Sequence, residues 1–96
     1  MAILDDVKLS LRVSNAAYNT EVTDLIAAAK LDLEITGIDS AKITDTDSLI
    51  KRAIILYCKA NFGYDNKDAD RLMESYVMLK THLSVSTDYH TYPVTE

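Results

Sequence analysis

Two kinds of side chain in this sequence could react or bind a metal ion: a single cysteine and two histidines. Cys58 could act as a nucleophile only with a base close to it in space, and a free cysteine is more often a buried core residue. His82 and His90 are eight residues apart, whereas two imidazoles that share a metal ion on one helix are four apart. We therefore expect Cys58 to lie in the core and both histidines to be solvated.

A short acidic segment is the other candidate for a binding site. Asp65, Asp68 and Asp70 could supply oxygen ligands to Ca²⁺, but an EF-hand loop needs ligands at alternating positions and a glycine at the sixth. Lys67 and Asp70 occupy the third and sixth positions here, so the match fails. The carboxylates fit better at the start of a following helix, where they offset its macrodipole. The sequence thus predicts no catalytic residues, no metal site and no cofactor, and we expect a protein that is not an enzyme.

Three basic residues, Lys51, Arg52 and Lys59, follow one side of a helix that we expect near the middle of the chain. They could contact phosphates. They could instead pair, within a subunit or between subunits, with the carboxylates of the preceding predicted helix, which are Glu21, Asp24, Asp32 and Glu34. The second interpretation is favoured, because 15 acidic and 10 basic residues give a formal net charge of -5, which argues against nonspecific nucleic-acid binding.

Length and composition indicate one small domain. A chain of 96 residues that is 48% hydrophobic can form a core, although a domain of this size buries only a modest fraction of its surface. With one cysteine there is no intrachain disulfide, which fits a reducing cytoplasm. No apolar run approaches the roughly 20 residues that span a bilayer, and the acidic start lacks the basic end of a signal peptide. We expect no membrane segment.

The first predicted element is ambiguous. Residues 7–13 alternate between apolar and polar types as in a strand, while Leu4, Val7 and Leu11 form an equally good helical stripe. We favour a short helix from about Leu4 to Arg12, because a lone strand would have no partner elsewhere in the chain.

The second helix is expected to run from a cap at Asn19 or Thr20 to a stop at Gly37. Its apolar face consists of Val22, Leu25, Ile26, Ala29 and Leu33. A second, weaker apolar stripe consists of Ala28, Leu31 and Ile35. This second stripe is either a set of spare surface residues or a contact covered by another copy of the chain. Together with Lys51, Arg52 and Lys59 it forms our candidate subunit interface.

The third predicted helix is the least ordinary part of the sequence. Residues 38–45 are expected to form a polar linker before it, Thr46 or Asp47 to cap it and Gly63 to end it. Between these bounds the sequence is apolar nearly all round the helix, and such a helix is normally buried on most sides. We therefore expect it at the centre of the bundle, with neighbouring copies as a further possible cover.

The last helix is expected after a cap at Asn66, with an apolar stripe from Ala69 to Leu83. The pattern then stops. The sequence therefore predicts a compact all-α bundle of about four helices over residues 1–84 and a flexible C-terminal tail over residues 85–96. Tyr89 and Tyr92 either anchor a contact between the tail and a partner or belong to an idle tail.

The order and spacing of these parts resemble the small head-tail connector proteins of tailed bacteriophages and prophages. Those chains begin with a short helix of the form Leu-acid-acid-Val-Lys-x-x-Leu-Arg-Val/Ile, which residues 4–13 reproduce. A helix like residues 25–30 and an all-round apolar helix like residues 49–63 then follow. The likeness covers about residues 4–83. It departs at residues 36–38, where many members carry an aromatic residue before the Thr-Gly pair.

The resemblance implies an all-α fold of about four helices and a structural role in the virion, with no catalysis and no cofactor. It implies a homo-oligomeric ring under the portal, matching the portal's symmetry, that extends the DNA channel without sequence-specific DNA binding. The ring would offer a docking surface to the tail or to a stopper protein. Synthesis in the host cytoplasm and a final location at the head-tail junction are also implied.

Two other classes of protein fit the sequence less well. A small helical regulatory or nucleic-acid-binding protein would need a basic recognition helix, and none of the four predicted helices has a clean basic face. An enzyme would need a nucleophile with its base, which the sequence does not supply.

Overall fold

The structure is a computed structural model that describes residues 3–62, 67–86 and 89. Its helices are α1 (Ile3–Leu11), α2 (Asn19–Thr36), α3 (Ser48–Asn61) and α4 (Ala69–Val85), with two short 3-10 helices, η1 (Ala16–Tyr18) and η2 (Ser40–Lys42). No strand occurs in the described part of the chain. The predicted all-α fold of four main helices is confirmed.

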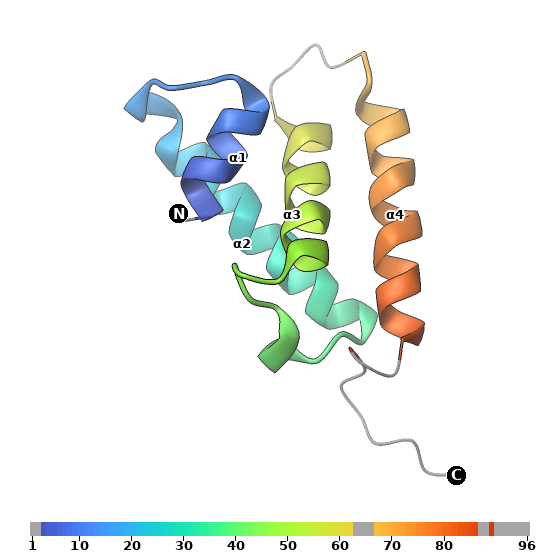
Figure 1. Cartoon of the computed structure of the whole chain (residues 1–96). Helices are drawn as coiled ribbons and strands as arrows, with labels where there is room; N and C mark the ends of the chain where they lie inside the picture. The colour runs from blue at the N-terminus through green and yellow to red at the C-terminus, as the bar shows by residue number, and fades with distance from the viewer. Residues whose placement is uncertain (1–2, 63–66, 87–88, 90–96) are drawn as a thin grey trace, which may run out of the picture.

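The central position belongs to α3. It contacts α1, α2 and α4, and Figure 1 shows α1 and α4 on either side of it while α2 crosses behind. Its buried residues are Ile50, Ala53, Ile54, Leu56, Cys58 and Ala60. Because helices pack on three sides of α3, apolar residues are needed nearly all round it, as the sequence predicted.

The first segment forms a helix and not a strand. α1 ends in a Schellman-type turn, in which the Arg12 N–H donates to the Leu9 carbonyl and the Val13 N–H donates to the Lys8 carbonyl, both at 3.1 Å. Arg12 has a φ of 63°, a left-handed conformation that glycine adopts more easily than arginine. The turn satisfies carbonyls that would otherwise lack partners at the helix end.

The predicted cap of α2 is wrong, whereas its predicted end is confirmed. The N-cap is Tyr18, which makes no side-chain cap bond, because η1 leads directly into α2. Asn19 is already the first residue of α2, and its side-chain oxygen accepts a 2.6 Å hydrogen bond from Lys8 instead. At the other end Gly37 has a φ of 117° and donates to the Glu34 carbonyl.

The segment between α2 and α3, predicted to be a polar linker, contributes one residue to the core. Ile38, assigned to a polar linker, is fully buried in the core. Its N–H donates to the Leu33 carbonyl, so the turn that ends α2 carries Ile38 inward. Asp47, rather than Thr46, caps α3 by accepting from the backbone N–H groups of Leu49 and Ile50.

The last helix extends slightly beyond its predicted stripe. α4 ends at Val85, and the buried residues Tyr76 and Leu83 face the core. Its N-cap is Asp68. The predicted stop of α3 at Gly63 and the predicted cap at Asn66 lie outside the described residues.

Candidate subunit interface

The second apolar stripe of α2, which consists of Ala28, Leu31 and Ile35 and is called the α2 stripe from here on, is exposed to solvent. Ala28 is exposed, and Leu31 and Ile35 are 57% and 75% exposed. The opposite face of α2, which includes Val22 and Leu33, is buried in the core. Much of the surface of these large aliphatic side chains therefore faces water in the monomer and could be covered by a partner.

The charged side of α3 differs from the prediction in one respect. Lys51 is half-buried and its ammonium lies 3.1 Å from the Asp6 carboxylate of α1, so its partner is not an acidic residue of α2. Arg52 is exposed and makes no hydrogen bond or ion pair with the described residues. Lys59 is half-buried. The sequence did not predict the Lys51 pair, because helical periodicity does not specify that α1 packs against α3.

The structure does not bring the two parts of the candidate interface together within one subunit. The α2 stripe lies on the side of α2 away from its buried face, and α2 packs that buried face against the bundle that contains α3. Contact between the stripe and Arg52 would therefore have to occur between different subunits. The interface residues stay a prediction.

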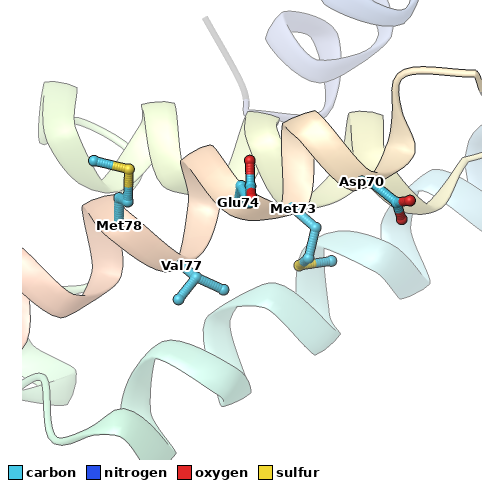
Figure 2. A pocket seen from close by; sticks show the side chains of 5 residues that line it. All are labelled: Asp70, Met73, Glu74, Val77 and Met78. Carbon is cyan, nitrogen blue, oxygen red and sulfur yellow. The ribbon is translucent and has the colours of Figure 1, made fainter.

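A second exposed apolar surface lies on α4, and the sequence analysis did not identify it. Val77, Met78 and Val85 are 43%, 65% and 67% exposed. A shallow pocket on this helix is lined by Asp70, Met73, Glu74, Val77 and Met78. Figure 2 shows Met73 and Val77 along one edge of the helix and Glu74 and Met78 along the other. Val77 and Met78 could have been found from sequence, because they are apolar residues that fall outside the predicted stripe of Ala69, Leu72, Met73, Tyr76, Leu79 and Leu83.

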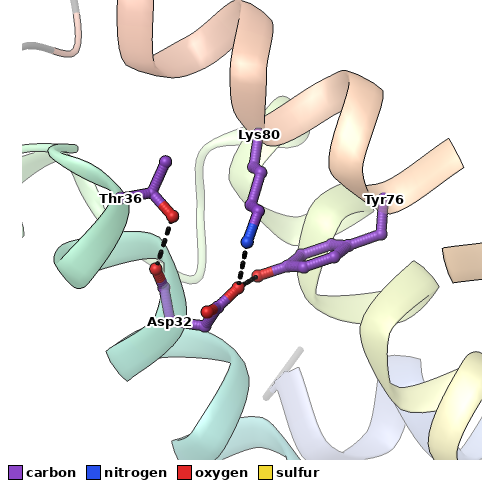
Figure 3. Close-up of polar contacts among 4 residues, drawn as sticks. All are labelled: Asp32, Thr36, Tyr76 and Lys80. Carbon is purple, nitrogen blue, oxygen red and sulfur yellow. Dashed lines mark hydrogen bonds and ion pairs between the residues drawn. The ribbon is translucent and has the colours of Figure 1, made fainter. Parts of the chain in front are cut away.

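Asp32 joins α2 to α4 through a compact set of polar contacts, drawn in Figure 3. One of its carboxylate oxygens accepts from the Tyr76 hydroxyl at 2.5 Å and from the Lys80 ammonium at 2.7 Å. The Lys80 nitrogen also lies 5.2 Å from the centre of the Tyr76 ring. Within the subunit the partners of Asp32 are thus residues of α4 and not the basic residues of α3.

The ionisation of this cluster follows from its contacts. Burial raises the pKa of Asp32, but the hydrogen bonds from Lys80 and Tyr76 outweigh it and leave the pKa below its usual value. Burial first, and then the hydrogen bond to Asp32, raise the pKa of Tyr76. Asp32 is thus the anion and Tyr76 the neutral donor at neutral pH. The cluster fixes α4 against α2.

Tyr89, assigned to the tail, packs against the body of the protein. Its ring is half-buried against the core, its hydroxyl donates to Asp47 at 2.9 Å, and its carbonyl accepts from the Asp39 N–H at 2.7 Å. It therefore links the end of the chain to the segment before α3. Tyr92, the other tail residue proposed to dock on a partner, lies outside the described residues.

The cysteine and the metal-ligating side chains form no reactive or metal-binding site among the described residues. Cys58 is fully buried, and burial raises the pKa of its thiol to about 12, so at neutral pH it is a protonated core residue and not a nucleophile. Among the described residues no group of three or more metal-ligating side chains comes together. Their helices also include none long and apolar enough to cross a membrane. His90 and Asp65 lie outside the described residues.

Comparison with known proteins gives the family. A family model described as phage connector protein matches residues 3–90, which include all four helices. No curated protein and no solved structure matches the chain. The matched region also contains the opening helix and the central apolar helix on which the resemblance rested. The chain therefore belongs to the phage connector family, the structural proteins of the head-tail junction of tailed phages.

Proposed function

We propose that copies of this chain assemble into a ring under the portal, joining head to tail and extending the DNA channel. The proposal is carried by one observation on a member of this family: the chain folds with the α2 stripe uncovered. Leu31 and Ile35 add exposed apolar area to a small bundle without stabilising it, and a neighbouring subunit would remove that area from water.

A closed ring of more than two identical subunits needs two different surfaces that fit each other. The α2 stripe is the first surface, and it is flanked by the exposed carboxylates of Asp24 and Glu34. The second is the outer side of α3, where Arg52 and Lys59 supply positive charge. Opposite charges around an apolar contact favour one orientation of the two subunits. Lys51 lies beside this surface, and its ammonium is paired with the Asp6 carboxylate of α1.

The apolar patch of each copy is small, so a single contact between two subunits is weak. Closure of the ring joins many such contacts, and the portal would hold the copies at a high local concentration. Rings are therefore expected at high protein concentration or on the portal, with a subunit number that matches the portal's symmetry.

The acidic balance of the chain suits a DNA channel. Each subunit carries a formal net charge of -5, so a ring of subunits repels the phosphate backbone. This repulsion is screened over roughly 8–10 Å at physiological salt, and DNA can pass without sequence-specific contacts. Residues after Tyr89, including Tyr92, are proposed to dock on the portal, the tail or a stopper protein, where an aromatic side chain contributes strongly to a contact.

The interface is tested by adding one charge to the stripe. Sedimentation velocity over a wide concentration range, with and without purified portal protein, should show that Leu31→Glu prevents assembly while the wild-type chain forms rings. Thr23→Glu is the matched control, because Thr23 is an exposed α2 residue off the stripe. Rings formed equally well by Leu31→Glu and Thr23→Glu would place the interface elsewhere. A wild-type chain that stays monomeric even with portal would contradict the function itself.

A further inference from the structure

A strained residue at the end of α1 is the starting point. Arg12 holds a φ of 63° in the turn that ends α1, a position where glycine avoids the steric cost that arginine bears. Its side chain is exposed and makes no hydrogen bond or ion pair with the described residues. One turn earlier Leu9 is 69% exposed. Within the part of the chain that the structure describes, both side chains are therefore largely open to a partner.

The complementary features occur on α4. Asp70 and Glu74 are exposed carboxylates that make no hydrogen bond or ion pair with the described residues. They line the same shallow pocket as Val77 and Met78, which are 43% and 65% exposed. Figure 2 shows the carboxylates and the apolar side chains along one helix. α4 thus presents acceptors without a cation, next to an uncovered apolar surface.

The α1 surface and the α4 surface lie on opposite sides of the subunit. α1 and α4 pack on either side of α3, so Leu9 and Arg12 cannot reach the α4 pocket of their own chain (Figure 1). Two different surfaces on opposite sides of one subunit are the arrangement that a head-to-tail ring requires.

We propose that Leu9 and Arg12 of one copy dock against Asp70, Glu74, Val77 and Met78 of the next copy in the ring. Leu9 covers the apolar residues, and Arg12 donates to the carboxylates, for which its planar guanidinium can form paired hydrogen bonds. The occupant is a second copy because this chain itself carries the matching apolar side chain and cation. The contact rests on the proposed ring function and adds α1 and α4 to an interface described so far by α2 and α3.

The strain at Arg12 gives an unusual test. Arg12→Gly removes both the left-handed strain and the cation, so the thermal midpoint of the monomer should stay the same or rise. The same variant should raise the protein concentration needed for half-maximal ring assembly by about tenfold or more, the effect of losing roughly 1.4 kcal/mol. Arg12→Lys is the conservative control, because it keeps the charge and the strain and should retain most of the assembly.

Charge exchange identifies the partner residue. Arg12→Glu and Glu74→Arg should each weaken assembly, and the double variant should restore it, since the pair is then reversed. Crosslinking gives a second readout, because Cys58 is buried. A mixture of Leu9→Cys and Met78→Cys copies should form a disulfide-linked dimer that neither variant forms alone.

The outcomes separate this contact from the ring itself. Wild-type rings that are unaffected by Arg12→Gly, Arg12→Glu and Glu74→Arg would overturn the contact and leave the proposed function standing. A wild-type chain that forms no ring, even on the portal, would overturn both. If Arg12→Glu and Glu74→Arg each weaken assembly but the double variant does not restore it, Arg12 and Glu74 are not in direct contact.

Discussion

Asp32 shows how one side chain can join elements that sequence patterns treat separately. It lies on α2, yet its carboxylate accepts hydrogen bonds from Tyr76 and Lys80 of α4, 44 and 48 residues later in the chain. Helical periodicity identifies Asp32 as an acidic residue off the core face but says nothing about which helix lies beside it. Within the subunit, Asp32 therefore contacts α4 and not the basic residues of α3, and a pairing of α2 carboxylates with α3 between subunits stays a prediction.

Removing the Tyr76 hydroxyl tests the contribution of this contact. Tyr76 is 1% exposed, so Tyr76→Phe keeps the packed ring and loses the charge-assisted hydrogen bond. We expect the free energy of unfolding to fall by about 1–2 kcal/mol in urea denaturation. Tyr57→Phe is the control, because the Tyr57 ring packs edge-on against Tyr76 but its hydroxyl makes no hydrogen bond with the described residues. A fall no larger than that of Tyr57→Phe would contradict the account.

The lowered pKa of Asp32 predicts that part of the free energy of unfolding is lost at acidic pH. Because the folded-state pKa lies below the ordinary value of 3.8, the stabilisation is complete above that value and is lost as the pH falls through the folded-state pKa. Asp32→Asn should therefore be less stable than wild type at pH 7, and the difference should shrink near pH 2.5. Urea denaturation at both pH values measures it. An unchanged difference would show that ionisation of Asp32 does not matter.

The buried thiol of Cys58 predicts slow chemical modification. At neutral pH the thiol is protonated because burial raises its pKa to about 12, and reagents attack the thiolate. Labelling of Cys58 by a thiol reagent should therefore track unfolding across a urea titration. Rapid labelling of the native protein would place Cys58 at the surface.

At the scale of helices, the apolar pattern was sufficient to predict four helices and the central place of α3. Pattern alone was insufficient at the joints. Tyr18 precedes α2 because η1 runs into it, and Ile38 is buried because the turn at Gly37 directs it inward. Both depend on backbone geometry that residue types do not specify. The outer face of α4 was not predicted, because its apolar residues Val77 and Met78 lie off the stripe that faces the core.

Two leucines of α3 separate a core role from a surface role. Leu56 is 6% exposed and Leu49 is 47% exposed, so the same substitution creates a cavity at one position only. We expect Leu56→Ala to lower the free energy of unfolding by about 2–4 kcal/mol and Leu49→Ala by less than about 1 kcal/mol. Equal losses would mean that α3 is not the centre of the bundle.

Tyr89 divides the predicted tail into two parts. Truncation after Tyr89 keeps its contacts with Asp39 and Asp47, whereas truncation after Ser86 removes the ring and the hydrogen bonds that Tyr89 makes with both residues. The shorter chain should therefore lose about 1–3 kcal/mol relative to the longer one in thermal or urea unfolding. If the two truncated chains are equally stable, Tyr89 does not anchor the chain end.

At the scale of the whole molecule, the described residues include large apolar side chains that stay exposed on several helices. Leu31 and Ile35 on α2, Val77 and Met78 on α4, and Leu9 on α1 are all substantially exposed. Assembly of several copies would explain why these apolar side chains lie at the surface, because neighbouring copies would remove them from water. The sequence predicted the α2 part of this surface, but the arrangement of α1 and α4 around α3 required the structure.

Electron microscopy of this chain mixed with its purified portal protein tests the central claim most directly. The account predicts a closed ring of copies stacked on the axis of the portal, with the subunit number of the portal and an open channel for DNA. Within the ring, α2 of each copy should face α3 of the next. A portal that binds no copies of the chain, or binds isolated copies that do not contact one another, would contradict the account.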